Sequence, residues 1–338
     1  MAQGIEIADI AWRVPENAVT NEALERECPA WDMRVVEERA GVKKRYIVRA
    51  DETALDLAAG ACRELFGRCP GLEGRVDALL FCTQSPDYIM PPNSAVLHGL
   101  LELGERVFAL DYNLACSGFP YGLAMAQGLA AAGLARNILL VTADTYSKYI
   151  HPQDRSARVL FGDGAAATWL RAVEGQGCLL AIECATCGKA HDKFIIPAGG
   201  CRRPRSALTC VPIADESGNV RTLENIQMDG MGILKFVSTK VAAQVRSVLA
   251  GSGLGDGDIA LYVFHQASKL ALDSLARQLR LPDEKVFRNI ESVGNTVSAS
   301  IPIALKEAWD RGRVARGDRV LLSGFGVGLS WSTAVVRL

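Results

Sequence analysis

The sequence predicts a layered α/β fold built from two copies of one α/β unit. Three observations predict it. Apolar, strand-like runs alternate with helix-like segments along the whole chain. Three sequence patterns recur in the same order in the two halves. The length of 338 residues also exceeds what one hydrophobic core usually supports.

The alternation is visible in short apolar runs separated by segments of helical period. A run of four or so buried-type residues predicts a strand, and a longer segment with apolar residues three or four apart predicts a helix. We expect strands at residues 78–81, 138–141, 261–264 and 320–322, and helices at residues 121–132, 240–250, 268–279 and 301–309.

The internal repeat consists of three pairs of similar segments. The pairs are residues 77–85 with 258–268, residues 133–137 with 312–317, and residues 161–164 with 325–328. Strand-then-glycine patterns are common, so the shared order is the informative feature. The join lies near residues 172–180, which predicts two halves at 1–175 and 176–338. The first half carries Cys116, and the second carries His265 and Asn295.

Charge and hydropathy argue against several classes of protein. The net charge is -1, and the densest basic run, Lys43-Lys44-Arg45, is short and followed by apolar residues. We therefore expect no nucleic-acid partner. Residues 1–6 lack the pattern of a signal peptide, and no apolar run is long enough to span a bilayer. The expected location is the cytoplasm, with no membrane contact.

Ten cysteines in a chain without an export signal are best explained as reduced thiols. Cys184 and Cys187 form a Cys-x-x-Cys pair, with Cys201, Cys210 and His191 nearby. Zinc or redox chemistry is an alternative, but the pair lacks a matched second pair of ligands. We expect no metal site.

The segment Ala115-Cys116-Ser117-Gly118-Phe119 follows a strand-like run and precedes a segment rich in Ala, Leu and Met. Cys116 is thus predicted at or just before a helix N-terminus, where the helix dipole favours the nucleophilic thiolate. Small neighbours allow a substrate to approach closely. Taken alone, the segment is more typical of a buried structural cysteine.

Three further segments carry candidate polar groups. His265 ends an apolar strand, where a parallel strand delivers side chains to a site, although a satisfied core histidine has the same setting. Asn295 opens a turn before a helix, where it could simply cap the helix. The glycine loop at residues 324–328 could offer a backbone N–H to an oxyanion or merely form a tight turn.

Together these segments resemble the β-ketoacyl-acyl-carrier-protein synthase III family of the thiolase superfamily. The resemblance extends nearly from end to end. It includes residues 38–42, the 115–119 box, Asp154-Arg155, residues 161–166, His265-Gln266-Ala267, Gly294-Asn295-Thr296 and residues 325–328. It implies a thiolase-like fold with two pseudo-duplicated α/β halves in a five-layered αβαβα arrangement.

The resemblance also implies the catalytic roles. Cys116 would carry the acyl group as a thioester, with the backbone N–H groups of Cys116 and Val327 forming the oxyanion hole. His265 and Asn295 would hydrogen-bond the thioester carbonyl of a malonyl-type extender and stabilise the enolate left when carbon dioxide departs. The implied function is condensation of an acyl thioester with malonyl-carrier protein. The resemblance implies no metal and no cofactor. Coenzyme A takes part only as the thioester substrate.

Binding residues follow from the same resemblance. Arg39, Arg155 and Phe325 would contact coenzyme A or substrate, and Met90 would reach across a homodimer to close the acyl pocket. Lys235 and Lys269 would belong to a basic surface that meets an acidic carrier protein. For each lysine taken alone, an ordinary solvated surface charge is the favoured interpretation.

The sequence departs from the family pattern at several places. Val35 stands where a tryptophan stacks on adenine, since Trp31 falls out of register, and Ser268 replaces the asparagine that usually follows His-Gln-Ala. Val327 occupies the centre of the glycine triplet, and residues 85–92 differ from the short-chain acetyl version. We therefore hypothesise a specialised member that uses an unusual acyl donor, on coenzyme A or a carrier protein.

Two alternative functions remain open from the sequence. A relative with the same fold could move the acyl group to oxygen or nitrogen without decarboxylation, but it would have little need for Asn295. A non-catalytic partner of an active synthase would usually have lost the nucleophile, whereas this chain has Cys116, His265 and Asn295.

Overall fold

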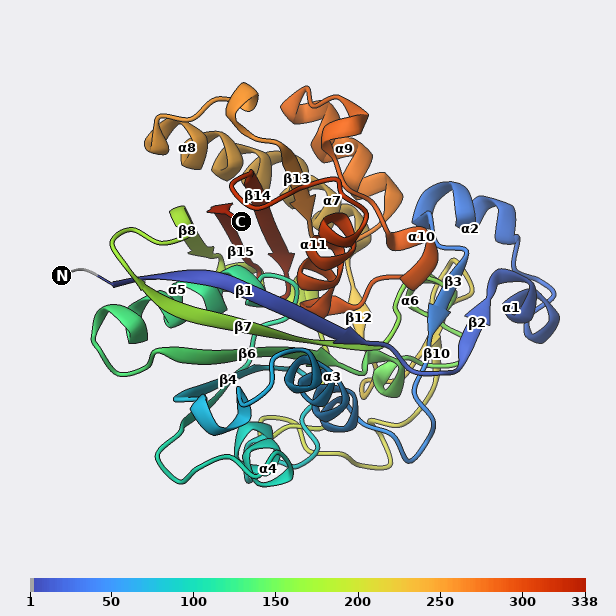
Figure 1. Cartoon of the computed structure of the whole chain (residues 1–338). Helices are drawn as coiled ribbons and strands as arrows, with labels where there is room; N and C mark the ends of the chain where they lie inside the picture. The colour runs from blue at the N-terminus through green and yellow to red at the C-terminus, as the bar shows by residue number, and fades with distance from the viewer. Residues whose placement is uncertain (1–2) are drawn as a thin grey trace.

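Two β-sheets form the framework of the protein in a computed structural model that describes residues 3–338. Met1 and Ala2, part of the segment that lacks a signal-peptide pattern, lie outside the described residues. The larger sheet has the strand order β1-β7-β6-β4-β5, and the smaller one the order β8-β15-β14-β13 (Figure 1). The two sheets share one pairing pattern. β1 pairs antiparallel with β7, as β8 does with β15, and β7 pairs antiparallel with β6, as β15 does with β14. β6 then pairs parallel with β4, as β14 does with β13. The two-copy prediction is confirmed.

The larger sheet is built around strands that are buried on both faces. Every residue of β4 is buried, as expected for a short apolar run covered by helices on both sides. Its strands are β1 (Gln3–Arg13), β4 (Ala78–Cys82), β5 (Phe108–Tyr112), β6 (Asn137–Asp144) and β7 (Gly164–Glu174).

The smaller sheet uses the second set of apolar runs. The strand expected at residues 261–264 matches β13, and the run at 320–322 is the centre of a longer strand. Its strands are β8 (Leu179–Thr186), β13 (Leu261–Phe264), β14 (Arg319–Gly326) and β15 (Ser330–Arg337). The predicted division between residues 175 and 176 falls in the turn between β7 and β8, and that division remains a prediction.

Two helices lie between the sheets, α5 (Gly118–Ala131) and α11 (Ser300–Asp310) (Figure 1). Each contacts strands of both sheets. Each helix is therefore buried on two opposite faces, one against each sheet, and small and apolar residues form these faces. Helix α5 begins three residues earlier than predicted, because Pro120 falls in its first turn, where a missing N–H costs nothing.

The outer faces of the two sheets are covered by separate helices, which completes the five predicted layers (Figure 1). Helix α3 (Ala54–Arg68) begins at a capping box formed by Thr53 and Asp56 and, with α4 (Asn93–Leu100), covers the larger sheet. Helix α8 (Ala242–Ser252) covers the smaller sheet, and α9 (Lys269–Leu279) packs beside it. The helix predicted from residue 240 starts with a π-helical turn over Val237–Val241.

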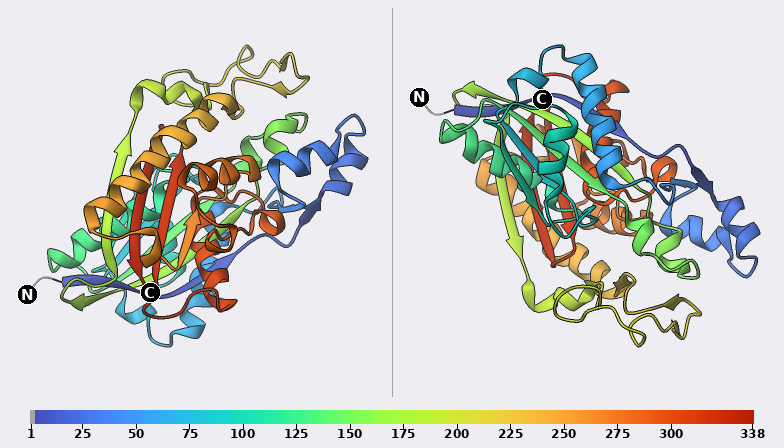
Figure 2. Two further views of the ribbon diagram at one scale, coloured as in Figure 1. Left: turned by 90° about the horizontal axis from the view of Figure 1, so that it is seen from above. Right: turned by 90° about the horizontal axis from the view of Figure 1, so that it is seen from below.

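Shorter elements project from one end of the layers (Figure 2). Some of them contribute residues to the site described below. The strands are β2 (Ala18–Thr20), β3 (Lys44–Tyr46), β9 (Phe194–Ile195), β10 (Ile213–Ala214), β11 (Val220–Arg221) and β12 (Gln227–Met228), and the helices are α1 (Asn21–Glu27), α2 (Met33–Ala40), α6 (Arg155–Arg158), α7 (Gly230–Phe236) and α10 (Ile290–Val293). Within residues 3–338, no helix is long and apolar enough to cross a membrane.

Candidate active site

Cys116 lies in the tight turn between β5 and α5, two residues before the helix begins, and its side chain is 3% exposed. The turn packs against the glycine loop of β14. A Cβ added at Gly324 would lie 2.3 Å from the Cys116 carbonyl oxygen, and one at Gly326 would lie 3.1 Å from Cys116 Sγ. Only glycine lets β14 approach the cysteine this closely.

The electrostatics of Cys116 correct one expectation from the sequence. Burial raises the pKa of the Cys116 thiol, and the nearby Asp144 carboxylate raises it further. The helix N-terminus was expected to favour the thiolate, but desolvation disfavours the charged form more strongly here. The resting group is therefore a protonated thiol.

Asp144 is a fully buried carboxylate at the end of β6. Burial raises its pKa to about 7, although donors partly compensate. Gln84 N donates to Oδ1 at 2.8 Å, and Ser298 Oγ donates to Oδ2 at 2.5 Å. The first bond connects β6 with the segment after β4, and the second connects it with the segment that follows Asn295.

His265 extends from the end of β13, and its backbone N–H donates to Ser323 O at 2.8 Å. The following side chain, Gln266, holds the turn by donating to Phe264 O at 2.8 Å. The imidazole packs edge-on against the Phe325 ring, with 5.5 Å between ring centres. Burial lowers the pKa of His265 to about 3, so the ring is neutral near pH 7.

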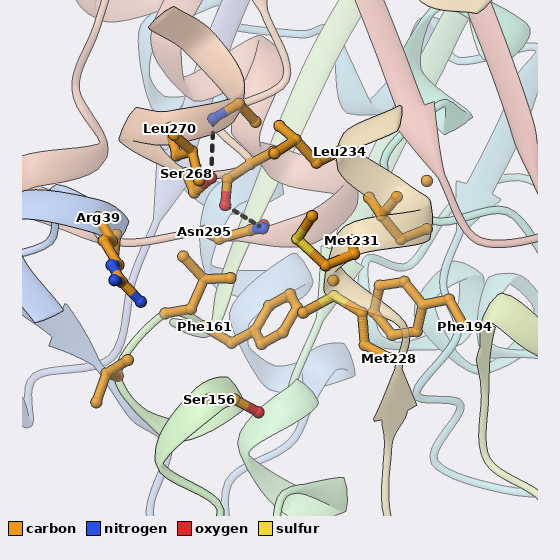
Figure 3. A pocket seen from close by; sticks show the side chains of 18 of the residues that line it. Arg39, Ser156, Phe161, Phe194, Met228, Met231, Leu234, Ser268, Leu270 and Asn295 are labelled. Atoms are coloured by element: carbon orange, nitrogen blue, oxygen red, sulfur yellow. Dashed lines mark hydrogen bonds between the residues drawn. The ribbon is translucent and has the colours of Figure 1, made fainter. Parts of the chain in front are cut away.

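Asn295 is fixed by its backbone and by both ends of its amide. Its backbone bonds to Leu160 O and Gly162 N at 2.9 and 3.0 Å. Val297 N donates to Asn295 Oδ1 at 3.0 Å, which identifies the oxygen of the amide. Asn295 Nδ2 donates to Ala267 O at 3.3 Å and keeps a second N–H (Figure 3). Asn295 therefore does not cap α11, whose N-cap is Ala299.

Gly294, just before Asn295, occupies a position that only glycine fits. Its φ is +72°, and an added Cβ would meet Arg45 Cβ at 3.0 Å and Leu160 O at 3.2 Å. An L-residue would be strained here by both its backbone and its side chain. The glycine thus lets the Asn295 turn lie directly against residues 160–162.

One cavity of about 740 Å³ brings the three predicted polar residues together, because Cys116, His265 and Asn295 all line it. The remaining wall is mostly apolar. Phe161, Met228 and Phe194 lie across from Leu270 and Leu234 in Figure 3. Its size and lining suit an organic ligand with a few polar groups.

Three of the four predicted substrate-binding residues also lie on this cavity: Arg39, Arg155 and Phe325. Arg39 is exposed and Arg155 is half-buried, while Phe325 is 2% exposed beside His265. Val35 lines the cavity and is 41% exposed. Trp31, out of register for this role, instead lies under the Arg158 guanidinium at 5.9 Å.

The other predicted residues lie off the cavity wall. Met90 is 79% exposed, and Lys235 is on the surface of α7. Lys269 pairs with Asp273 at 2.5 Å on α9. Val327 begins the turn after β14, and its carbonyl accepts a hydrogen bond from Ser330 Oγ at 2.7 Å.

Residues 3–338 contain no group of three or more His, Cys, Asp or Glu residues arranged to hold a metal ion. The ten cysteines are free thiols, and Cys184 and Cys187 are exposed.

Sequence reasoning missed several residues of the site. The apolar wall residues Phe194, Met228 and Met231 come from the segment between β8 and α8, which carries no periodic signal. Ser300 bonds to the imidazole of His265, and Asp144 lies near the thiol. Ser300 stands five residues after Asn295, but a serine at a helix start gives no hint that it meets a histidine.

Comparison with known proteins gives matches in both halves. A family model described as 3-oxoacyl-[acyl-carrier-protein] synthase III matches residues 110–188, and the model of its C-terminal part matches residues 249–338. The first range contains Cys116, and the second contains His265 and Asn295.

Individual relatives match over the full chain. The β-ketoacyl-[acyl-carrier-protein] synthase III of Rhodospirillum centenum is 35% identical over 328 residues, which is 96% of each chain. A solved 3-oxoacyl-(acyl-carrier-protein) synthase III is 40% identical, with a TM-score of 0.97 over 99% of this chain and 100% of the other. The priming β-ketosynthase of the R1128 polyketide pathway is 26% identical, with a TM-score of 0.86 over 100% and 97%.

Proposed function

Because this chain belongs to the β-ketoacyl-acyl-carrier-protein synthase III family of the thiolase superfamily, we propose that it condenses an acyl thioester with malonyl-carrier protein. The acyl group is carried on Cys116. The observation that carries the proposal is the meeting of Cys116, His265 and Asn295 on one largely apolar cavity. A nucleophile and two neutral hydrogen-bond donors are the groups that this reaction needs.

In the first step, the sulfur of Cys116 attacks the carbonyl carbon of the acyl thioester. The S–H proton leaves as the S–C bond forms, and the departing thiol receives a proton. Thioester exchange costs little free energy, so the acyl group stays activated. The backbone N–H groups of Cys116 and Val327 are proposed to bind the oxyanion of the tetrahedral intermediate. The close packing of Cys116 against Gly324 and Gly326 supports this assignment.

In the second step, the malonyl unit loses carbon dioxide, and its electron pair moves onto the thioester carbonyl as an enolate. His265 and the second Nδ2–H of Asn295 are proposed to donate hydrogen bonds to that oxygen. Both donors are neutral and fixed before substrate arrives, which favours the charge that develops in the transition state. The enolate carbon then attacks the acyl carbon on Cys116, the C–S bond breaks, and the departing sulfur takes up a proton from solvent to regenerate the thiol.

The proposed substrates carry phosphates, and the cavity has cations that suit them. Arg39 and Arg155 line the cavity and are assigned to the nucleotide of coenzyme A. Val35 offers less stacking surface than a tryptophan, which supports a specialised acyl donor bound more by its acyl chain. The thioester is a substrate, and no separate cofactor takes part.

Partner proteins are also proposed. Lys235 and Lys269 remain the candidates for contact with an acidic carrier protein, although the pairing of Lys269 with Asp273 weakens its contribution. A homodimer is proposed because β5 is the edge of its sheet and exposes Phe108 and Leu110. Met90 lies on an exposed loop, consistent with insertion into a second copy.

The test is to incubate the protein with a panel of acyl-coenzyme A and acyl-carrier donors and to map adducts by peptide mass spectrometry. The proposal expects an acyl adduct on Cys116, none in Cys116→Ala, and a 3-oxoacyl product after malonyl-carrier protein is added. Transfer to an alcohol or amine without release of carbon dioxide would identify an acyltransferase instead. Absence of any adduct across the panel would indicate a non-catalytic partner. Equal acylation by acetyl-coenzyme A and every longer donor would remove the case for specialisation.

A further inference from the structure

Ser300 is the only side chain that bonds to the imidazole of His265 among residues 3–338. Its Oγ lies 2.6 Å from His265 Nδ1, and both residues are 2% exposed. Ser300 is the first residue of α11, whereas His265 follows β13, so this bond connects the central helix layer to the smaller sheet.

The direction of this bond follows from counting donors. If Nδ1–H donated to Ser300 Oγ, the hydroxyl hydrogen of Ser300 would need another acceptor, and residues 3–338 offer none within hydrogen-bonding distance. A buried donor without an acceptor costs free energy, whereas a hydroxyl oxygen with an unused lone pair costs much less. The favoured arrangement has Ser300 Oγ–H donating to an unprotonated Nδ1.

We propose that Ser300 is a positioning residue that holds His265 in the tautomer with the proton on Nε2. Because His265 lines the cavity and Nδ1 is occupied by Ser300, Nε2 is the ring nitrogen available to a ligand. The imidazole therefore meets substrate as a hydrogen-bond donor. Because burial lowers the pKa of His265, the ring is a neutral imidazole and not an imidazolium. It therefore offers the ligand only the Nε2 proton.

The tautomer has a different consequence for each of the two reaction steps. This consequence rests on the proposed function. An Nε2–H donor suits the developing enolate oxygen beside Asn295, but it has no lone pair with which to take the proton of Cys116. Ser300 should consequently matter for decarboxylation and condensation, and should matter little for acylation of Cys116.

The test that needs no activity is nuclear magnetic resonance of the whole protein labelled with nitrogen-15 histidine. The chain has four histidines, and His265→Gln identifies the signals of His265. The proposal expects a protonated-type shift at Nε2 and an unprotonated-type shift at Nδ1. The reverse assignment in the wild-type protein overturns the proposal, whatever its activity.

A kinetic test uses Ser300→Ala with Ser292→Ala as a matched control, since Ser292 donates to Asn289 O in the same region but outside the cavity. In Ser300→Ala we expect the rate of malonyl decarboxylation to fall about tenfold, because one hydrogen bond is lost. The rate of Cys116 acylation should not change. Ser300→Thr keeps the hydroxyl and should recover much of the rate. Equal loss of both steps, or no loss, contradicts the proposal. Failure of the wild-type protein to acylate would instead defeat the proposed function and leave the tautomer measurement valid.

Discussion

At the scale of single residues, burial decides the chemistry of the site. It raises the pKa of Cys116 and lowers that of His265, so both groups rest in their neutral forms. The proposed reaction can therefore begin from a neutral thiol and a neutral imidazole, and new charge develops on the substrate oxygens. Neutral donors of fixed orientation stabilise that charge without reorganising.

The neutral state of His265 leads to a measurable pH dependence. Burial places its pKa near 3, below the ordinary 6.5, so His265 should keep neutral-imidazole shifts from pH 8 down to pH 5. Its unfolded form takes up a proton near pH 6.5, so this residue contributes full stability above that pH and progressively less as pH falls towards 3. A nitrogen-15 titration of the labelled protein checks this. Protonation of His265 near pH 6.5 would contradict it.

Replacing Asn295 by Ala should separate the two steps of the reaction. The change removes the proposed donor to the enolate oxygen, and we expect decarboxylation of the malonyl substrate to slow by about 100-fold. Acylation of Cys116 should change by less than about threefold, since Asn295 is not assigned to that step. Rapid-quench measurement of each step provides the check. A loss confined to acylation would mean that the role of Asn295 has been assigned to the wrong half-reaction.

The sequence predicted the residues that sit in recognisable local patterns. Cys116 before a helix, His265 at a strand end and Asn295 after glycine each have a distinctive neighbourhood. Ser300 and Asp144 do not, because they contact residues that are distant in the sequence. Ser300 bonds to His265, 35 positions away, and Asp144 to Ser298, 154 positions away. The thiolate expectation failed for a related reason: a helix terminus is visible in sequence, but the burial that opposes it is not.

At the scale of elements, the site depends on the contact between the start of α5 and the end of β14. Gly324 touches the backbone of Cys116 and Ser117. Buried serines reinforce this contact, since Ser332 Oγ donates to Ser117 O at 2.9 Å and Ser117 Oγ lies 2.7 Å from Ser330 Oγ. The helix start and the glycine loop are therefore held as one unit.

Substitution of Gly324 by Ala should disrupt that unit. The new methyl would lie 2.3 Å from Cys116 O and 2.8 Å from Ser117 Cα, both backbone atoms that cannot rotate away. We expect a loss of about 2 kcal/mol in the free energy of unfolding and loss of Cys116 acylation. Denaturant unfolding and adduct mapping measure the two effects.

Gly128→Ala is the matched control on the same helix. Gly128 is an exposed position of α5 with no atom near an added Cβ, so the change should raise the free energy of unfolding by up to about 1 kcal/mol. Acylation should be unaffected. Equal tolerance of alanine at Gly324 and Gly128 would show that the close packing is not required.

The predictability of the elements follows their periodicity. The apolar run of β13 and the amphipathic pattern of α9 were evident from sequence. The short strands β9 to β12 were not, because each has two residues and depends on a partner from elsewhere. That segment nevertheless supplies Met228 to the cavity wall.

At the scale of the whole molecule, residues from both parts of the duplicated fold line the cavity. The first half contributes Cys116, and the second contributes His265 and Asn295. The repeat was visible as three patterns in the same order, which is why the architecture could be predicted. The size and lining of the cavity could not, since they arise where the halves meet.

The exposed edge at β5 leads to a prediction about assembly. Phe108 and Leu110 are 45% and 40% exposed on an edge strand, so we expect a dimer formed at this edge. Leu110→Arg should shift the protein towards monomer, as measured by sedimentation velocity at micromolar concentration. Leu208→Arg, at an 80% exposed residue away from β5 in the chain, should not. A wild-type monomer, or an unchanged dimer in Leu110→Arg, would place the interface elsewhere or remove it.

A single-turnover experiment tests the central claim most directly. Acylated protein, freed of donor, is mixed with malonyl-carrier protein labelled with carbon-13 at the free carboxyl group. We predict that each acyl group lost from Cys116 yields one labelled carbon dioxide and one 3-oxoacyl product. Carbon dioxide without loss of the Cys116 adduct, or loss of the adduct without carbon dioxide, would contradict condensation at this cysteine.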